Sequence, residues 1–258
     1  MSRRRTVLPG DEGTSSATSI QSVERAVALL RLFLPNVASL GPTDIAQLSG
    51  MSVSTAHRYC SALHKAGLLR YDEATGRYGL GGGCIELGLA ATEAMPLIDL
   101  ARPLMSEVVD HVDRATVLGV WDEQSVRVVE VNDHTTAAAR VTVRVGSQLS
   151  VFDTAQGLVF LAHSKQVRQR FAHRPELDQL RDAIERTERE GCAIVRSTAG
   201  PTTIPGVTIA AVPVFLGQHI IASLAIIGSS ESMPDSADSQ VIDYLKETAA
   251  QLSRRLSA

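Results

Sequence analysis

The chain has 258 residues, a net charge of −3, 44% hydrophobic residues and 21% charged residues. This composition is typical of a globular protein and argues against a collagen-like or disordered chain. No apolar run reaches the roughly 18 residues that a membrane-spanning helix needs, and no signal peptide is recognisable. The length is sufficient for two domains.

The charge is unevenly distributed along the chain. Residues 1–81 contain nine Lys/Arg and six Asp/Glu, which leaves +3, and the remainder contains 16 and 22, which leaves −6. A basic N-terminal part followed by an acidic remainder is typical of a protein whose N-terminal part contacts phosphates. Cys60, Cys84 and Cys192 are widely spaced without a CxxC pattern. They predict reduced thiols in a cytoplasmic protein, with neither a disulfide framework nor a zinc site.

Residues 1–17 are rich in Arg, Pro, Gly, Ser and Thr and predict a disordered tail. A helix is expected next, because Thr18 and Gln21 fit a capping box and Pro35 is a helix stop. Its apolar residues at helical spacing are expected to face the core, and these are Ile20, Val23, Val27, Leu30 and Leu34.

Residues 41–67 predict two short helices around a tight turn. Thr43 is the expected N-cap of the first, which ends at Leu48. Ser52 is the expected cap of the second, which ends before Gly67. The second helix is expected to turn one face to the core, formed by Val53, Ala56, Tyr59, Cys60, Leu63 and Ala66.

The opposite face of the second helix carries hydroxyls and cations but no carboxylate. A helix that enters a DNA major groove needs such groups for base edges and phosphates. The alternative is an ordinary helical hairpin with a solvated face, although such faces usually mix both signs of charge. The residues concerned are Ser54, Arg58, Ser61 and Lys65, with His57 at the edge.

Two alternating segments, Leu68–Tyr71 and Arg77–Leu80, follow with turn residues between them and predict a β-hairpin. A helix pair followed by a hairpin is a winged helix-turn-helix, so we predict that residues 18–81 bind DNA. The tail arginines either join this contact or are only solvated. The expected DNA contacts are Thr43, Ser52, Ser54, Thr55, His57, Arg58, Ser61, Lys65 and Arg77.

Residues 82–96 predict a linker, with a helix over Cys84–Ala94. Its glycines lack the GxxxxGK[ST] pattern of a phosphate loop. A further helix is expected over Leu97–Val112, broken early by Pro103.

Residues 97–258 predict a second, α+β domain. Strands are expected over Ala115–Trp121, Ser125–Asn132, Arg140–Val145, Cys192–Val195, Val207–Phe215 and Ile220–Ile227. Helices are expected over Thr154–Ala162 with Asp153 as cap, over Glu176–Glu190 and over Val241–Leu256. The expected sheet is mainly antiparallel and six-stranded.

This order of segments resembles the IclR family of bacterial transcription regulators over most of the chain beyond the tail. No single motif is decisive, but five occur in the family's order. They are Ser22–Ala26, Ser54–Arg58, Gly79–Gly81, Val145–Gly157 and Ile209–Phe215.

The resemblance implies a homodimer or homotetramer that represses or activates transcription, with dimers paired through the DNA-binding domains. It also implies that the second domain binds a small organic or aromatic acid as effector. The amides at the start of the Thr154 helix would take its carboxylate, which the helix dipole favours. By position, the pocket would be lined by Leu149, Ala155, Gln156, Ile209, Ala225 and Ile227.

The sequence departs from the family's pattern in two places. The segment Cys192–Gly206 is longer and lacks the family's usual acidic residues, and the late pocket positions are all apolar. Both favour a larger or aromatic ligand over a very small polar one. Trp121 either lines the pocket or belongs to the hydrophobic core. Arg140 and Arg144 either pair with an acid ligand or are solvated.

Catalysis has little support, because no GxSxG, HExxH or Walker pattern occurs. Cys192 beside Gly191 is either a nucleophile or a buried structural thiol. We expect no catalytic site, no bound metal and no cofactor. Three functions stay open: a ligand-responsive regulator, a regulator whose second domain only oligomerises, and an enzyme fused to a DNA-binding module.

Overall fold

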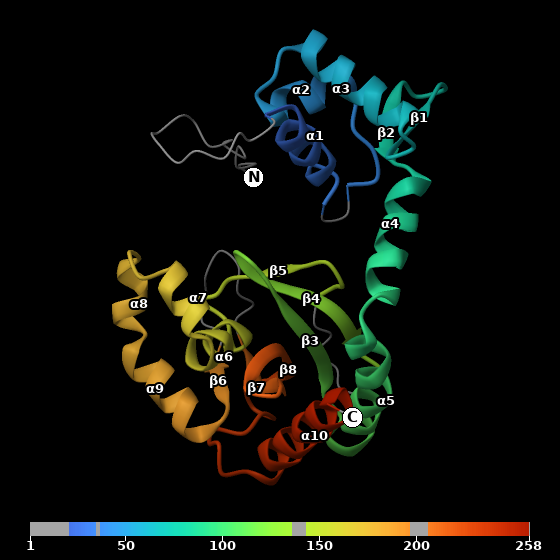
Figure 1. Cartoon of the computed structure of the whole chain (residues 1–258). Coiled ribbons are helices and arrows are strands. Elements are labelled where there is room, and N and C mark those ends of the chain that lie inside the picture. Colours follow the sequence, from blue (N-terminus) through green and yellow to red (C-terminus); the bar gives the residue numbers. More distant parts are fainter. Residues whose placement is uncertain (1–20, 35–36, 136–142, 197–205, 258) are drawn as a thin grey trace. The chain divides into compact units, whose positions relative to one another are not determined.

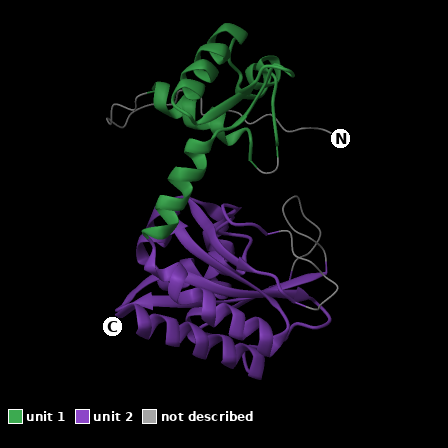
Figure 2. Cartoon of the chain, turned by 90° about the vertical axis from the view of Figure 1, so that its right-hand side faces the viewer, with its two compact units in different colours: residues 1–94 green, residues 95–258 purple. Residues whose placement is uncertain are grey.

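The computed structural model describes residues 21–34, 37–135, 143–196 and 206–257. The chain divides into two compact units, Met1–Ala94 and Met95–Ala258, which Figure 2 shows in green and purple. The expected tail, the Thr18 cap, Ile20 and Pro35 lie outside the described residues. No described helix is long and apolar enough to cross a membrane.

The first unit is the predicted winged helix-turn-helix (Figure 1). β1 and β2 pair antiparallel from Leu69↔Leu80 to Asp72↔Arg77, which confirms the hairpin. Gly81 is needed after it, because a Cβ there would lie 2.3 Å from the Gly67 carbonyl oxygen. The elements are α1 (Gln21–Arg31), α2 (Pro42–Ser49), α3 (Val53–Lys65), β1 (Leu69–Asp72), β2 (Arg77–Leu80) and α4 (Gly82–Glu93).

The predicted inward stripe of α1 is wrong at three of its residues, Val23, Val27 and Leu34, and confirmed at Leu30. Val23 and Val27 are 57% and 41% exposed, whereas Leu29 and Phe33 are buried. The helix carries two apolar ridges, and periodicity alone does not say which one packs on the core. Leu30 does pack against this core, but Leu34, beyond the helix, is exposed.

The predicted cap of α2 is also wrong. Gly41, not Thr43, is the N-cap, because Pro42 occupies the first helical position, where its missing N–H costs nothing. Asp44 accepts a hydrogen bond from the Gly41 N–H at 3.2 Å. In α3, Ser52 caps as predicted, but Val53 and Ala66 are exposed rather than inward.

The second unit is the predicted α+β domain. Its six-stranded sheet is antiparallel throughout, in the order β5-β4-β3-β8-β7-β6. The strands are β3 (Ala115–Asp122), β4 (Ser125–Asn132), β5 (Gln148–Leu149), β6 (Ala193–Arg196), β7 (Val207–Leu216) and β8 (His219–Ser229). The helices are α5 (Pro96–Val112), α6 (Ala155–His163), α7 (Lys165–Arg170), α8 (Pro175–Gln179), α9 (Arg181–Glu190) and α10 (Gln240–Ser257).

The sheet is covered on both faces (Figure 1). On one face, α5 and α10 bury Leu118, Leu224 and Ile226. On the other, α6 to α9 bury Val126, Ala211 and Ala225. Residues facing opposite sides alternate along β7 and β8, which explains why both strands are apolar almost throughout.

Several predicted boundaries in the second unit are wrong. α5 runs unbroken through Pro103, because burial of its other face outweighs a proline cost of roughly 3 kcal/mol. Thr154, not Asp153, caps α6. The predicted helix over Glu176–Glu190 is two helices, α8 and α9, separated at Leu180, and α7 was not predicted.

The predicted strand over residues 140–145 is not supported where it can be checked. Residues 140–142 lie outside the described part, Val143 and Arg144 are not in a strand, and Val145 begins a turn. Gln148 and Leu149 form the short edge strand β5 instead, paired with β4.

Candidate nucleic-acid interface and ligand site

One face of α3 is exposed and positively charged. His57, Arg58 and Lys65 are exposed, and Ser61 is half-buried. Within the described residues, none of the three basic side chains makes a hydrogen bond or ion pair, and α3 itself contains no carboxylate. The opposite face is anchored by Ala56, Cys60 and Leu63, which are buried in the unit's core. The cations are therefore available to a polyanion.

The predicted hydroxyl contacts lie at the start of α3 and in α2. Ser52, Ser54 and Thr43 are exposed, and Thr55 is half-buried. Ser52 Oγ accepts from the Thr55 N–H at 3.2 Å, which satisfies one of the free amides of the first turn. α3 thus begins at a fixed position, with its first residues at the surface.

Arg77 is more firmly tied into the domain than the sequence suggests. Its Nε donates to Ser39 Oγ at 3.0 Å, and its Nη2 donates to the Ser39 carbonyl at 3.1 Å. Nη2 also lies 3.5 Å from Asp44 Oδ2 at the start of α2. Arg70, on the same hairpin, is exposed and makes no hydrogen bond or ion pair within the described residues. Arg77 links the wing to α2, and Arg70 is the freer cation.

This difference gives a prediction for a matched pair of variants. Arg77→Ala should lower the free energy of unfolding by about 1 kcal/mol, because it removes two charge-assisted hydrogen bonds from a partly exposed site. It should weaken binding to all DNA sequences alike.

Arg70→Ala should leave stability unchanged and reduce the salt dependence of DNA binding by about one phosphate contact. Denaturant titration and salt-dependent binding measure both effects. Unchanged stability in Arg77→Ala would contradict the anchoring role.

The predicted effector residues gather on the sheet face that α6 covers. The register pairs Ile209 with Ile227 and places Ala225 beside them on the same face of β8. Leu149, Trp121, Ala155 and Ala225 belong to the hydrophobic cluster of this face. Leu149 and Ile209 also pack against Ile227 in a small adjoining cluster. The structure therefore brings together residues from five elements.

Gln156 is buried, and its side chain makes hydrogen bonds that hold the fold together. Its Nε2 donates to the Ser223 carbonyl at 3.1 Å and lies 3.2 Å from Ser223 Oγ. It also donates to the Val117 carbonyl at 3.4 Å. A Cβ at Gly119 would lie 2.8 Å from this nitrogen, so the glycine leaves room for the amide. Gln156 thus fixes α6 against the centre of the sheet.

Aromatic rings surround one side of this face. Trp121 lies 5.9 Å from Phe160 and 6.1 Å from Phe171, and Phe152 lies 5.2 Å from Phe171, measured between ring centroids. Trp121 is half-buried, so it belongs to an aromatic cluster at the edge of the core. The three phenylalanines were not predicted from the sequence, because they come from different elements and have no common spacing.

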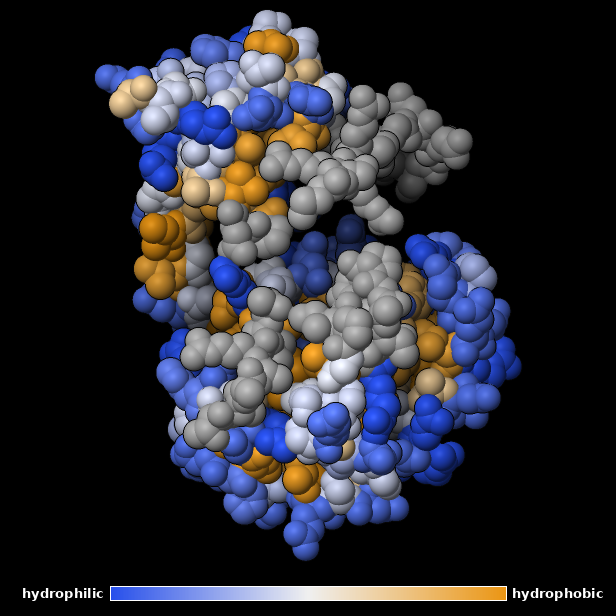
Figure 3. Space-filling model, turned by 180° about the vertical axis from the view of Figure 1, so that it is seen from behind, coloured by the Kyte–Doolittle hydropathy of each residue, from blue (hydrophilic) through white to orange (hydrophobic). Residues whose placement is uncertain are grey.

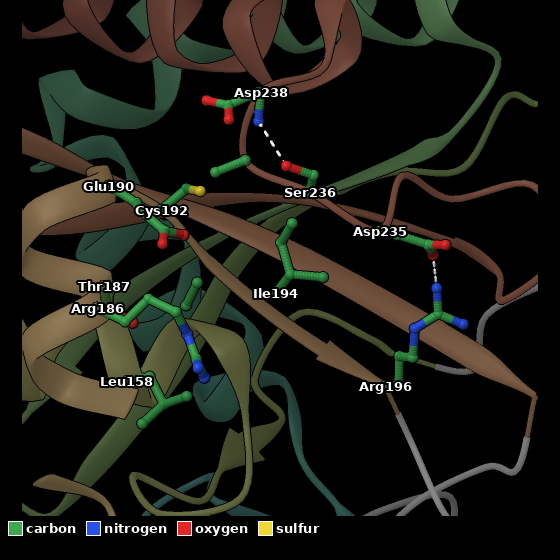
Figure 4. A pocket seen from close by; sticks show the side chains of 12 residues that line it. Leu158, Arg186, Thr187, Glu190, Cys192, Ile194, Arg196, Asp235, Ser236 and Asp238 are labelled. Carbon is green, nitrogen blue, oxygen red and sulfur yellow. Dashed lines mark hydrogen bonds and ion pairs between the residues drawn. The ribbon is translucent and has the colours of Figure 1, made fainter. Parts of the chain in front are cut away.

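A separate cavity of about 540 Å³ lies along the free edge of β6 (Figure 4). Glu190 and Cys192 lie towards one end, and Arg196 forms an ion pair with Asp235 at the other. No residue predicted to bind the effector is among the described residues that line it. Arg186 also lines it and makes no hydrogen bond or ion pair within the described part of the chain. This cavity is therefore a second place where a ligand could bind.

The two buried cysteines, Cys60 and Cys192, are held as thiols. Burial raises the pKa of the Cys60 thiol to about 11, and it raises the pKa of Cys192 as well, so the reactive thiolate is disfavoured at both. Among the described residues, no group of three or more His, Cys, Asp or Glu side chains could hold a metal ion.

Comparison with known proteins identifies both domains. Residues 22–73 match the IclR helix-turn-helix domain, and residues 89–254 match the bacterial transcriptional regulator IclR C-terminal domain. The glycerol operon regulatory protein of Streptomyces griseus is 28% identical over 94% of this chain and 98% of its own length. The transcriptional regulator XynR of Escherichia coli is 27% identical over 92% and 97%.

A solved structure has the same architecture. An IclR homologue from Microbacterium hydrocarbonoxydans, complexed with 4-hydroxybenzoate, superposes with a TM-score of 0.76 at 25% identity, over 91% of this chain and 98% of that one. The two family matches, the winged helix-turn-helix and the antiparallel sheet agree, and the chain therefore belongs to the IclR family of DNA-binding transcriptional regulators.

Proposed function

We propose that this protein is a ligand-responsive regulator whose second unit binds a small organic or aromatic acid and thereby changes operator affinity. The observation that carries the DNA-binding part is the exposed face of α3, whose cations have no partner within the described residues. In this proposal α3 enters the major groove, Arg58 contacts a base edge, and Lys65 and the wing contact phosphates.

We place the effector on the sheet face covered by α6, against Leu149, Ile209 and Ile227. The half-buried Leu149 and Ile209 and the neighbouring aromatic cluster suit a ring, and the start of α6 suits its carboxylate. The structural neighbour in complex with 4-hydroxybenzoate supports an acid of this class. The apolar character of Ile209, Ala225 and Ile227 favours the ring over a small polar acid.

In this proposal, dimerisation couples ligand binding in the second unit to operator binding. α4 has no buried residue, and Ile85, Leu87 and Leu89 are each more than half exposed; Figure 3 shows this hydrophobic surface in orange. Exposed apolar patches of this kind mark interaction surfaces. We propose that a second copy covers it and that the ligand changes the spacing of the two recognition helices. A ligand shifts operator affinity only by its differential affinity for the two arrangements.

Thermal unfolding with a panel of aromatic and aliphatic acids tests the ligand site. A true effector at about 100 times its Kd should stabilise the protein by about 2.7 kcal/mol. Ile209→Phe, which fills the proposed site, should abolish this stabilisation. Arg186→Ala, in the cavity beside β6, is the matched control and should retain it.

The outcomes separate the open functions. Loss of stabilisation in Arg186→Ala but not in Ile209→Phe would move the site to the β6 cavity. Stabilisation by no acid would favour a second unit that only oligomerises. Turnover of the bound acid would favour an enzyme. A ligand that binds but leaves operator affinity unchanged would contradict the coupling.

A further inference from the structure

The start of α3 presents an apolar side chain at the protein surface. Val53 is the first residue of α3 and is 53% exposed. It is not among the residues that pack against the core of the first unit. It is the one large hydrophobic residue of α3 that is exposed. The other exposed large hydrophobic residues in the described part of this unit lie on α1, just after α1, on the wing and on α4.

The neighbouring hydroxyl of Ser52 is not available to read a base. A hydroxyl has one donor and two acceptor positions. Ser52 Oγ accepts from the Thr55 N–H and lies 2.8 Å from Thr55 Oγ1 and 3.1 Å from Ser54 Oγ. All three positions are therefore used inside the cap. Ser52 fixes the start of α3 and leaves Val53 as the exposed group beside it.

The position of Val53 suits a base contact of a particular kind. The first residues of a recognition helix reach furthest into the major groove. Val53 lies one turn before His57, so the two share a ridge that borders the cationic face. The apolar feature of the major groove is the C5-methyl group of thymine, which distinguishes this base from the other three.

We infer that Val53 packs against the C5-methyl group of a thymine and so makes the operator specific for thymine at one position in each half-site. This inference rests on the proposed DNA-binding function and adds a specificity-determining residue to it. Arg58 reads a different base edge and the phosphate contacts supply affinity, whereas Val53 selects a methyl group that a hydroxyl could not recognise.

Replacing thymine by uracil tests the inference, because it removes only the methyl group. Operators are first selected from a random duplex pool with the wild-type protein, and each thymine is then replaced in turn. In each half-site, the replacement of one particular thymine should weaken wild-type binding about fourfold. This loss corresponds to one buried methyl group. Val53→Ala, which removes both γ-methyl groups, should discriminate less between the thymine and uracil operators than the wild type does. Val23→Ala, which removes a similarly exposed valine of α1, should keep the discrimination.

Two results would contradict the inference but not the proposed DNA binding. In the first, no thymine replacement weakens binding by the wild type. In the second, Val53→Ala discriminates between thymine and uracil as strongly as the wild type does. Failure to select any duplex would instead defeat the proposed function. The uracil scan of the wild type requires no substitution in the protein, so it is decisive even where a variant does not fold.

Discussion

Arg58→Ala should weaken operator binding by about 1–3 kcal/mol, a factor of roughly 5 to 150, if Arg58 contacts a base edge as proposed. Arg58 is exposed in the middle of α3 and makes no hydrogen bond or ion pair within the described residues, so its loss should cost the fold little. The substitution should also relax preference at one base position. Titration of the selected operator and of single-base variants measures both effects.

Arg31→Ala is the matched control for Arg58→Ala. Arg31 is an exposed arginine of the same unit, at the end of α1, and its loss should change operator affinity far less. Equal effects of the two substitutions would mean that only net charge matters, and the base contact would be wrong.

Among the described glycines of the second unit, Gly157 should be the one whose replacement by alanine is most destabilising. A Cβ there would lie 2.4 Å from the Val151 carbonyl oxygen and 2.6 Å from that of Ser150. These are backbone atoms, which cannot rotate away as a side chain can. Overpacking commonly costs about 1–3 kcal/mol, and we expect the upper end here. For a unit of this size that is a loss of about 6–12 °C in Tm.

The same substitution should weaken ligand binding. To accommodate the new methyl group, the segment before α6 must move, and Leu149 and Phe152 belong to it. Gly82→Ala, at the start of α4 and before the apolar residues proposed to meet a second copy, provides the comparison, because a Cβ there has no neighbour within 4 Å and alanine favours a helix. Calorimetry should show a lowered Tm only for Gly157→Ala. Equal Tm values for Gly157→Ala and the wild type would show that the tight packing before α6 is not as described.

Most of the elements were predictable because they carry a local signal, whereas α7 and the short strand β5 were not predicted. Ser52 and Gly67 bracket α3, alternation marks the hairpin, and short segments rich in β-branched and other apolar residues mark the strands β3, β4, β7 and β8. Side-chain partners distant in the sequence were not predictable. Arg77 bonds to Ser39, and Gln156 bonds to Ser223, and neither pair has a recognisable pattern in the sequence.

Local competition explains the remaining errors. α1 has two apolar ridges, and tertiary packing selects the one with Leu29 and Phe33. Val53 fits the inward periodicity of α3, but the core does not extend as far as the first residue of the helix. In α5, packing on the sheet overrides the local signal of Pro103. The proposed ligand site was predictable only as far as family resemblance placed it, because the aromatic cluster beside it is assembled from separate elements.

The most direct test of the central claim is the affinity of the intact protein for duplex DNA from upstream of its own gene, measured over a range of salt concentrations. The exposed, carboxylate-free face of α3 predicts tight binding at low ionic strength that falls steeply with salt, as phosphate contacts release counterions. A folded protein that binds no such duplex at low ionic strength would contradict the claim.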